Sequence, residues 1–366
     1  MTTMRALVGY DVGEPVDVLR LETRPVPEPG RGQVRVRVQA APINPNDLHI
    51  LRGRYGLAPE LPAALGQESV GVIDALGEGV ESATVGQRVV TIGVTGTWQD
   101  YVLADAERVL AVPDGMSTST AAQLLTNPLT GLLLVTTELD VQPGEWLLQS
   151  AAGSTVGKVV AQLGRHFGFK TINVVRRRSA VVEILELGGT EVISTEDQDL
   201  PSRVAEIVGE DGVRKAIDCV AGQLGADISR SLAPGGEMIV YGALSTHRQT
   251  EPDKLTIPLH AASVIYGTKL VRGFWLHRWF ATTPRQQIGA ALARNLGLVA
   301  SGIVRIPEGQ PMELEQFAEA VHLAEAPARG GKPIFVPGGD GVNDGMPGSA
   351  VHTATKPGVT GRASIR

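Results

Sequence analysis

Hydrophobic and polar residues alternate along the first third of the chain, in short segments separated by glycine. The segment "QVRVRVQAAPI" (33–43) begins with strict alternation, and "ESVGVIDALGEGV" (68–80), "GQRVVTIG" (86–93) and "WQDYVLAD" (98–105) are similar short runs. A period of two is the pattern of a strand with one exposed face. Short strands at close spacing with glycine turns predict a small barrel or sandwich over residues 1–125.

The pattern changes near residue 120, where longer apolar segments begin. "STSTAAQLLTNPLTGLLLVTTEL" (117–139) is typical of a helix broken at Pro128. After it, strand-like segments at 145–150, 170–178, 191–195, 215–220 and 237–244 alternate with helix-like segments. This alternation is typical of βαβ units, so we predict an α/β fold with a doubly wound parallel sheet over residues 126–304.

The last part of the chain contains one more helix and one more strand. "PMELEQFAEAVHLAEA" (311–326) has the spacing of an amphipathic helix, and "GGKPIFVP" (330–337) is strand-like. Residues 338–366 are rich in glycine, serine, threonine and proline and contain no aromatic residue. Such a segment buries too little apolar surface to offset the entropy of ordering, so we expect it to be disordered.

Composition narrows the class of protein. The 366 residues carry a net charge of −6, which argues against a dedicated nucleic-acid binder. No run of about 18 apolar residues predicts a membrane span, and the start "MTTMRALVGYDVGEP" lacks a signal or transit pattern. We therefore expect a cytoplasmic protein with no membrane partner, with a mature form whose targeting segment was removed as the alternative. Cys219 is the single cysteine, which excludes an intrachain disulfide and a cysteine-based zinc site.

The strand, turn and helix at 145–168 carry the strongest signal for a ligand. A dinucleotide-binding turn has the pattern G-x-G-x-x-G, and Ala152, Ser154 and Gly157 occupy its three positions here. Small residues let the backbone approach a pyrophosphate at the helix N-terminus. Because only the third position is glycine, a plain turn without a ligand stays an alternative.

Three arginines predict which dinucleotide binds. Arg176 stands nineteen residues after Gly157 and is followed by Arg177 and Arg178. NAD sites usually place an acidic residue near this position for the ribose 2′-hydroxyl, whereas arginine accommodates the 2′-phosphate of NADP. We therefore predict NADPH as the cofactor, with a solvated basic strand end as the alternative.

One tyrosine lies in a short loop bounded by proline, "GRYGLAPELP" (53–62). A phenol in a loop on a rigid scaffold can donate a hydrogen bond or a proton to a substrate oxygen. Tyr55 is therefore a candidate catalytic residue. The alternative is an amphipathic loop anchor with a buried ring and a solvated hydroxyl.

This order of segments resembles the medium-chain dehydrogenase/reductase superfamily. The resemblance implies a GroES-like β-rich catalytic domain over 1–125 and 305–337, with a Rossmann domain inserted over 126–304. In zinc-dependent members a cysteine falls where this chain has Asn44 and a histidine where it has Gln67, and a four-cysteine lobe is absent here. We therefore expect a zinc-independent enzyme.

Within the zinc-free branch the chain is similar to 2-enoyl thioester reductases of the mitochondrial type. The segments that carry the similarity are "INPNDLHILRGRYGLAPELPAALGQE" (43–68), "NPLT" (127–130), "SAAGSTVG" (150–157), "TINVVRRR" (171–178), "YGAL" (241–244) and "RGFWLHRW" (272–279). The resemblance implies NADPH-dependent reduction of the C2=C3 double bond of an enoyl-CoA or enoyl-acyl-carrier-protein, in a homodimer joined through Rossmann edge strands.

The resemblance also implies roles for individual residues. Tyr55 would be the donor to the enolate oxygen formed after hydride transfer, and Asn127 would form a hydrogen bond with the cofactor near its nicotinamide or the ribose attached to it. Lys332 would reach the cofactor from the returning strand. The pyrophosphate would lie among Ser154, Thr155, Val156 and Gly157. The nicotinamide and acyl pocket would be lined by Tyr241, Gly242, Ala243, Leu244, Phe274, Trp275 and Leu276.

Three functions stay open from the sequence. The first is the enoyl thioester reductase, the second a quinone or enone reductase with the same fold and cofactor, and the third a non-catalytic binding or regulatory protein. For the aromatic residues at 274–280, ordinary packing or a dimer interface is an alternative role. The histidines, including His49 and His277, show no ligand-like spacing and are expected to be surface or core residues.

Overall fold

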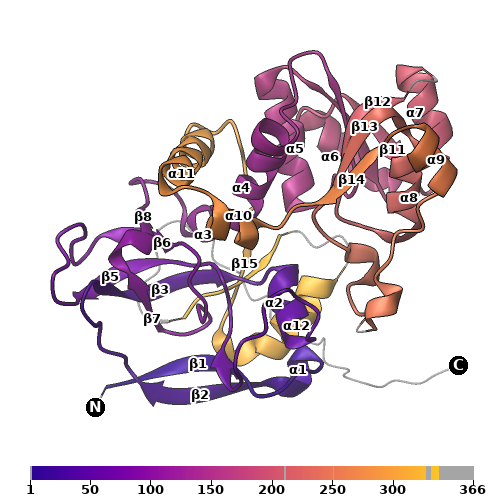
Figure 1. The fold of residues 1–366 in the computed structure, drawn as a ribbon. Coiled ribbons are helices and arrows are strands. Elements are labelled where there is room, and N and C mark those ends of the chain that lie inside the picture. The colour runs from indigo at the N-terminus through magenta and orange to yellow at the C-terminus, as the bar shows by residue number, and fades with distance from the viewer. Residues whose placement is uncertain (1, 210–211, 250, 327–330, 338–366) are drawn as a thin grey trace, which may run out of the picture.

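The computed structural model describes residues 2–209, 212–249, 251–326 and 331–337 and shows two lobes (Figure 1). The β-rich lobe contains strands β1 (Thr3–Gly9), β2 (Leu19–Pro25), β3 (Gln33–Pro42), β4 (Ala63–Ala64), β5 (Val70–Leu76), β6 (Arg88–Thr91), β7 (Tyr101–Asp105) and β8 (Val109–Ala111), with helices α1 (Pro15–Val18) and α2 (Pro45–Leu51). Strands β1, β2 and β4 form a small antiparallel sheet, and β3, β5, β6, β7 and β8 belong to a larger one.

Strand β3 explains why this lobe folds as the sequence pattern predicts. Its side chains alternate between half-buried and buried over residues 33–40, with Val34, Val36 and Val38 facing inward. Each inward valine packs in a core that also contains Trp98, whose indole nitrogen donates to the carbonyl of Pro42 at 3.2 Å. The alternation therefore fixes which face of the sheet is buried.

The end of the described chain returns to this lobe. Strands β15 (Gln310–Met312) and β16 (Pro333–Phe335) are parallel to each other, and β16 pairs antiparallel with β3. Helix α12 (Phe317–Glu325) lies beside α1 and α2, as Figure 1 shows in yellow and indigo. The amphipathic segment expected at 311–326 is thus a strand, a short 3₁₀ turn and a helix, because Pro311 lies in β15 and α12 begins only at Phe317.

The parallel-sheet lobe is built on six strands in the order β11-β10-β9-β12-β13-β14. Their bounds are β9 (Trp146–Gln149), β10 (Lys170–Val175), β11 (Glu191–Ser194), β12 (Val213–Asp218), β13 (Leu232–Val240) and β14 (Leu270–Gly273). All five pairings are parallel. In chain order this sequence of strands is 3-2-1-4-5-6, which is the doubly wound arrangement of dinucleotide-binding folds.

Helices cover this sheet and connect the lobes. They are α3 (Thr118–Ala122), α4 (Thr126–Leu133), α5 (Thr155–Phe167), α6 (Val181–Glu186), α7 (Leu200–Val208), α8 (Gly222–Arg230), α9 (Ala261–Tyr266), α10 (Leu276–Thr282) and α11 (Arg285–Ala300). Helices α4, α5 and α11 share one apolar core with β9. Gly131 of α4 permits this, because a Cβ there would lie 2.9 Å from the side chain of Val159 in α5.

Several sequence-based boundaries are wrong. Pro128 does not break a helix but lies in the first turn of α4, where its missing N–H has no intrahelical partner to lose. The break lies earlier, between α3 and α4. The strands predicted over 170–178 and 237–244 end at Val175 and Val240, where the chain leaves the sheet for the loops that form the site. The tail expected to be disordered, 338–366, lies outside the described residues.

Candidate active site

A cavity of about 480 Å³ lies between the two lobes. It opens beyond the carboxyl ends of β12 and β13 and beside the turn that follows β9. Eleven of the residues predicted for the site line it, although they come from both lobes and span 222 positions of the chain, from 55 to 276. They are Tyr55, Asn127, Ser154, Val156, Tyr241, Gly242, Ala243, Leu244, Phe274, Trp275 and Leu276.

The turn of small residues before α5 allows the helix to pack closely against it. Ser154 is the N-cap of α5, and its hydroxyl oxygen accepts a hydrogen bond from the backbone N–H of Gly157 at 3.1 Å. A Cβ on Gly157 would lie 2.5 Å from the Cα of Ala152 and 2.7 Å from the carbonyl oxygen of Ala151. Ala151 itself has φ 45°, an uncommon backbone conformation for alanine. Gly157 is therefore needed for the tight packing of α5 on the turn.

The three arginines follow directly on β10 at its carboxyl end. Arg176 is exposed, Arg177 is half-buried, and Arg178 forms an ion pair with Asp197 at 2.5 Å. Within the described part of the chain, no carboxylate forms an ion pair with Arg176 or Arg177. These two guanidinium groups are thus available to an anion, whereas Arg178 is already paired with an acid.

Tyr55 and Trp275 meet inside the cavity. The indole Nε1 of Trp275 donates a hydrogen bond of 2.8 Å to the Tyr55 hydroxyl oxygen, and the two rings are 5.7 Å apart at an angle of 86°. Burial raises the pKa of the Tyr55 hydroxyl above its ordinary value. The phenol is therefore protonated at neutral pH and can act as a donor.

A buried polar network lies beside this cavity. Lys332 donates to the Oδ1 of Asn44, and Asn127 donates to the same oxygen at 3.2 Å. The amide of Asn44 donates to Glu68 at 3.2 Å. Glu68 also accepts the backbone N–H groups of Leu125 and Thr126 at 2.8 and 2.9 Å. This network orients Asn127, which lines the cavity, and places Lys332 behind it.

The side chains beside this cavity do not fit a zinc ion. Asn44 and Gln67 carry neutral amides, and the Gln67 amide donates a hydrogen bond to Asp47 at 3.3 Å. Asp47 is the third residue of α2 and closes its capping box, because its carboxylate accepts the backbone N–H of Asn44 at 2.7 Å. Within the described ranges, no three histidine, cysteine or acidic side chains are grouped in a way that could hold a metal. Zinc prefers cysteine and histidine ligands, which these positions lack.

Some predicted residues do not line the cavity, and some lining residues were not predicted. Thr155 and Gly157 lie in α5 behind Ser154, Arg176 to Arg178 lie at the end of β10, and Lys332 lies behind Asn44. Side chains that the sequence argument did not assign include His49, Arg54, Cys219 and Phe280. Burial raises the pKa of the Cys219 thiol to about 12, so this cysteine is not a thiolate nucleophile.

The arrangement fits a dinucleotide. Strands β10 and β12 lie on opposite sides of β9, so the chain leaves the sheet in opposite directions at this point. Ligands of open α/β sheets bind in the crevice at such a switch point. The capped turn of Ser154 lies on this crevice, and the two unpaired arginines stand at the end of the adjacent strand β10. Fold and site together define a nucleotide-dependent oxidoreductase of the medium-chain dehydrogenase/reductase type.

Comparison with known proteins supports the same class of enzyme. Residues 30–114 match the alcohol dehydrogenase GroES-like domain, and residues 155–293 match the domain described as zinc-binding dehydrogenase. The mitochondrial enoyl-[acyl-carrier-protein] reductase of Xenopus tropicalis is 32% identical over 340 residues, which cover 91% of this chain and 95% of that protein. The chain therefore belongs to the enoyl-[acyl-carrier-protein] reductase family, and the predicted GroES-like and Rossmann fold is confirmed.

Solved structures share the fold. A candidate NADPH:quinone reductase from Bacillus thuringiensis superposes with a TM-score of 0.85 at 29% identity, covering 92% of this chain and 99% of that one. Etr1p, solved with NADP and crotonyl-CoA, has a TM-score of 0.80 at 23% identity, with 92% and 100% covered. In the described residues no helix has the length and apolarity needed to cross a bilayer.

Proposed function

We propose that the protein reduces the C2=C3 double bond of 2-enoyl thioesters with NADPH. The observation that carries this proposal is the Tyr55 hydroxyl, which lies protonated in the interlobe cavity and is fixed there by Trp275. The relatives that define the family are named enoyl-[acyl-carrier-protein] reductases. A donor of this kind is what a reaction that builds an enolate requires.

NADPH fits better than NADH because of the charges at the end of β10. Arg176 and Arg177 are without carboxylate partners among the described ion pairs and follow the strand that ends beside the adenosine position of this fold. A guanidinium pairs strongly with a phosphate. When bound, NADPH supplies the hydride that reaches the substrate at Cβ. Ser154, Val156 and Asn127 would hold it from the parallel-sheet lobe.

The chain's own residues then stabilise the charge that forms on the substrate. Negative charge develops on the thioester oxygen as Cβ accepts the hydride, and the Tyr55 O–H donates to that oxygen. A preorganised donor of this kind is worth about 3 kcal/mol of barrier when it is removed by mutation. Tyr55 or a water molecule beside it delivers the proton to Cα. Phe274, Leu276 and Phe280 give the cavity an apolar wall that excludes water from the acyl group.

The experiment compares two acceptors and two tyrosines. Turnover of crotonyl-CoA with NADPH should exceed turnover of a small quinone, and Tyr55→Phe should lower kcat/KM for crotonyl-CoA by about a hundredfold or more. Tyr266→Phe is the matched control, because Tyr266 is 84% exposed and lies outside the cavity. Equal rates of the wild type and Tyr55→Phe would contradict the assigned role.

A second candidate function is reduction of quinones or enones. It is favoured by the solved structure from Bacillus thuringiensis, whose description is that of a quinone reductase and which is 29% identical. Such an acceptor also takes a hydride at a conjugated carbon and needs no carrier-bound acyl chain. A preference for the quinone in the same assay would select this function instead.

The assembly that we propose is a homodimer joined at the edge strand β14. This strand is the last in the order of the sheet and pairs with β13 on one side. Leu270 of this strand is 51% exposed, and Ile265 and Tyr266 of the preceding helix α9 are 65% and 84% exposed. A second copy of the same edge could extend the sheet and cover these groups.

Cytoplasmic location stays a prediction, since the curated relatives are named mitochondrial.

A further inference from the structure

The loop that carries Tyr55 is tied to the opposite lobe by its neighbour Arg54. Helix α2 ends at Leu51, and Gly53 follows in the left-handed region with φ 66°, so the chain turns sharply before Tyr55. The Arg54 guanidinium then crosses between the lobes. It donates to the carbonyl oxygens of Thr246 and Gln249, the latter at 2.8 Å, and to the Thr246 hydroxyl at 3.2 Å.

The contacts of Arg54 orient its guanidinium group but do not neutralise its charge. Among the described ion pairs none joins Arg54 to a carboxylate, although Arg52 two residues earlier pairs with Glu14 and Glu325. Burial, with the nearby charge of Arg52, lowers the pKa of Arg54. A half-buried guanidinium that bonds only neutral acceptors is held for its geometry, because its planar fork reaches several acceptors at once.

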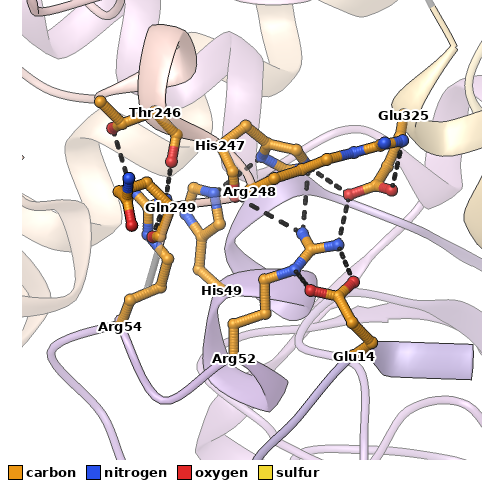
Figure 2. Close-up of polar contacts among 9 residues, drawn as sticks. All are labelled: Glu14, His49, Arg52, Arg54, Thr246, His247, Arg248, Gln249 and Glu325. Carbon is orange, nitrogen blue, oxygen red and sulfur yellow. Dashed lines mark hydrogen bonds and ion pairs between the residues drawn. The ribbon is translucent and has the colours of Figure 1, made fainter. Parts of the chain in front are cut away.

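A second set of contacts holds the same two segments together. The Nε2 of His49 and the Nδ1 of His247 lie 2.7 Å apart, and the Nε2 of His247 lies 2.9 Å from Glu325. Burial lowers the pKa of His49 to about 3 and also lowers that of His247, so both rings are neutral and one donates to the other. We define the interlobe clamp as His49, Arg52, Arg54, Thr246, His247 and Gln249 (Figure 2).

Both ends of the clamp are next to the reaction site. Arg54 precedes Tyr55, and Thr246 follows Leu244, which lines the cavity with Tyr241. Tyr55 is also held from the parallel-sheet lobe by Trp275. The tyrosine loop is therefore fastened to the cofactor-binding lobe on two sides, once through its hydroxyl and once through the preceding side chain.

We propose that Arg54 is a positioning residue that sets the Tyr55 hydroxyl relative to the cofactor-binding lobe. This inference rests on the proposed function, because it needs a reaction in which Tyr55 takes part. If Arg54 has this role, removing its guanidinium group slows the chemical step because the Tyr55 hydroxyl is displaced. A displacement of about 1 Å in a catalytic group can cost a hundredfold in rate.

The test is a double-mutant cycle with Arg54→Met, Tyr55→Phe and the pair. Arg54→Met should lower kcat by about tenfold to a hundredfold, and should change kcat by less than about twofold when Tyr55 is already phenylalanine. Arg54→Lys keeps the charge without the fork and should also lose rate. The control is Arg248→Met, since Arg248 belongs to the same loop, is exposed, and pairs with Glu325 rather than with the tyrosine loop. An equal loss in both backgrounds overturns the proposal.

Amide hydrogen exchange gives a readout that needs no turnover. Arg54→Met should speed exchange at residues 54–58 and 244–249 together, while Arg248→Met should leave 54–58 unchanged. Unchanged exchange at 54–58 in Arg54→Met overturns the tether. A wild-type protein that binds NADPH but reduces no enoyl thioester contradicts the proposed function, and the exchange result then decides the tether by itself.

Discussion

Trp275 donates the hydrogen bond from its indole N–H to the hydroxyl oxygen of Tyr55, over 2.8 Å and across the boundary between the lobes. Since the indole N–H can only donate, it occupies a lone pair of the phenol oxygen and leaves the phenol proton for another acceptor. The pair is thus arranged so that Tyr55 donates towards the cavity. The bond is also a direct link between the β-rich lobe and the lobe that holds the cofactor.

Trp275→Phe should weaken catalysis without removing the donor. The aromatic contact with Tyr55 remains, but the hydroxyl loses one fixed partner, worth about 1 kcal/mol or about fivefold in rate. Steady-state kcat for crotonyl-CoA measures this effect. Trp279→Phe is the matched control, because Trp279 packs on Phe280 and does not line the cavity. A larger effect at Trp279 than at Trp275 would count against the hydrogen bond.

Arg176→Ala combined with Arg177→Ala should change cofactor preference. Each lost charge-assisted bond to the 2′-phosphate costs about 1.5–3 kcal/mol, so the KM for NADPH should rise at least tenfold. The KM for NADH should change little, because NADH lacks that phosphate. Arg178→Ala serves as the control, since Arg178 is paired with Asp197. An equal rise for both cofactors would assign these arginines to another role.

Asp47 should give the activity a pH dependence. Burial raises the pKa of this carboxyl to about 7, and its charge acts on Tyr55. Above that pH an additional negative charge stands near the developing enolate, so kcat should fall as the pH rises through about 7. Asp47→Asn keeps an acceptor for the N–H of Asn44 and should abolish this change.

The same group makes a prediction for stability. The folded protein keeps the Asp47 proton up to a pH of about 7, whereas the unfolded chain releases it near 3.8. The free energy of unfolding should therefore decline as the pH rises across that window, by up to about 1.4 kcal/mol per pH unit. Urea unfolding of the wild type and Asp47→Asn at several pH values measures the difference, and parallel curves would contradict it.

The edge strand gives a prediction for assembly. Tyr266→Glu with Leu270→Glu places two charges where a second copy would cover apolar groups, so this double variant should be a monomer in solution. Analytical ultracentrifugation distinguishes the two states. Val182→Glu is the control, because Val182 is 63% exposed and lies on α6. A wild type that is monomeric at all concentrations would contradict the proposed dimer.

The local sequence pattern predicted the fold well because each helix or strand is specified by residues close together in the chain. The alternating valines of β3 and the small residues before α5 each specify one element and the face that it buries. Pro128 was misinterpreted because proline breaks a helix interior but is tolerated in a first turn, and the pattern does not say where that turn begins. The domain boundaries at 125 and 305 stay a prediction.

The residues proposed for the site came from recognisable segments of the sequence. Ser154 and Tyr55 were proposed because each lies in such a segment, and both line the cavity. The bond between Trp275 and Tyr55 joins residues 220 positions apart, and that between His49 and His247 joins residues 198 apart. His49 was expected to be an ordinary surface or core residue, yet it lines the cavity. No periodicity encodes such pairs, because they exist only once both lobes have folded.

The pairing of β16 with β3 has a consequence for biosynthesis. The ribosome makes β3 early and β16 only after all six strands of the parallel sheet. The first-made lobe must therefore wait, with one edge of β3 unpaired near Pro42, while the second-made lobe can complete its sheet during translation. The nascent chain can thus complete the parallel sheet of the cofactor-binding lobe before the β-rich lobe that carries Tyr55 gains its last strand.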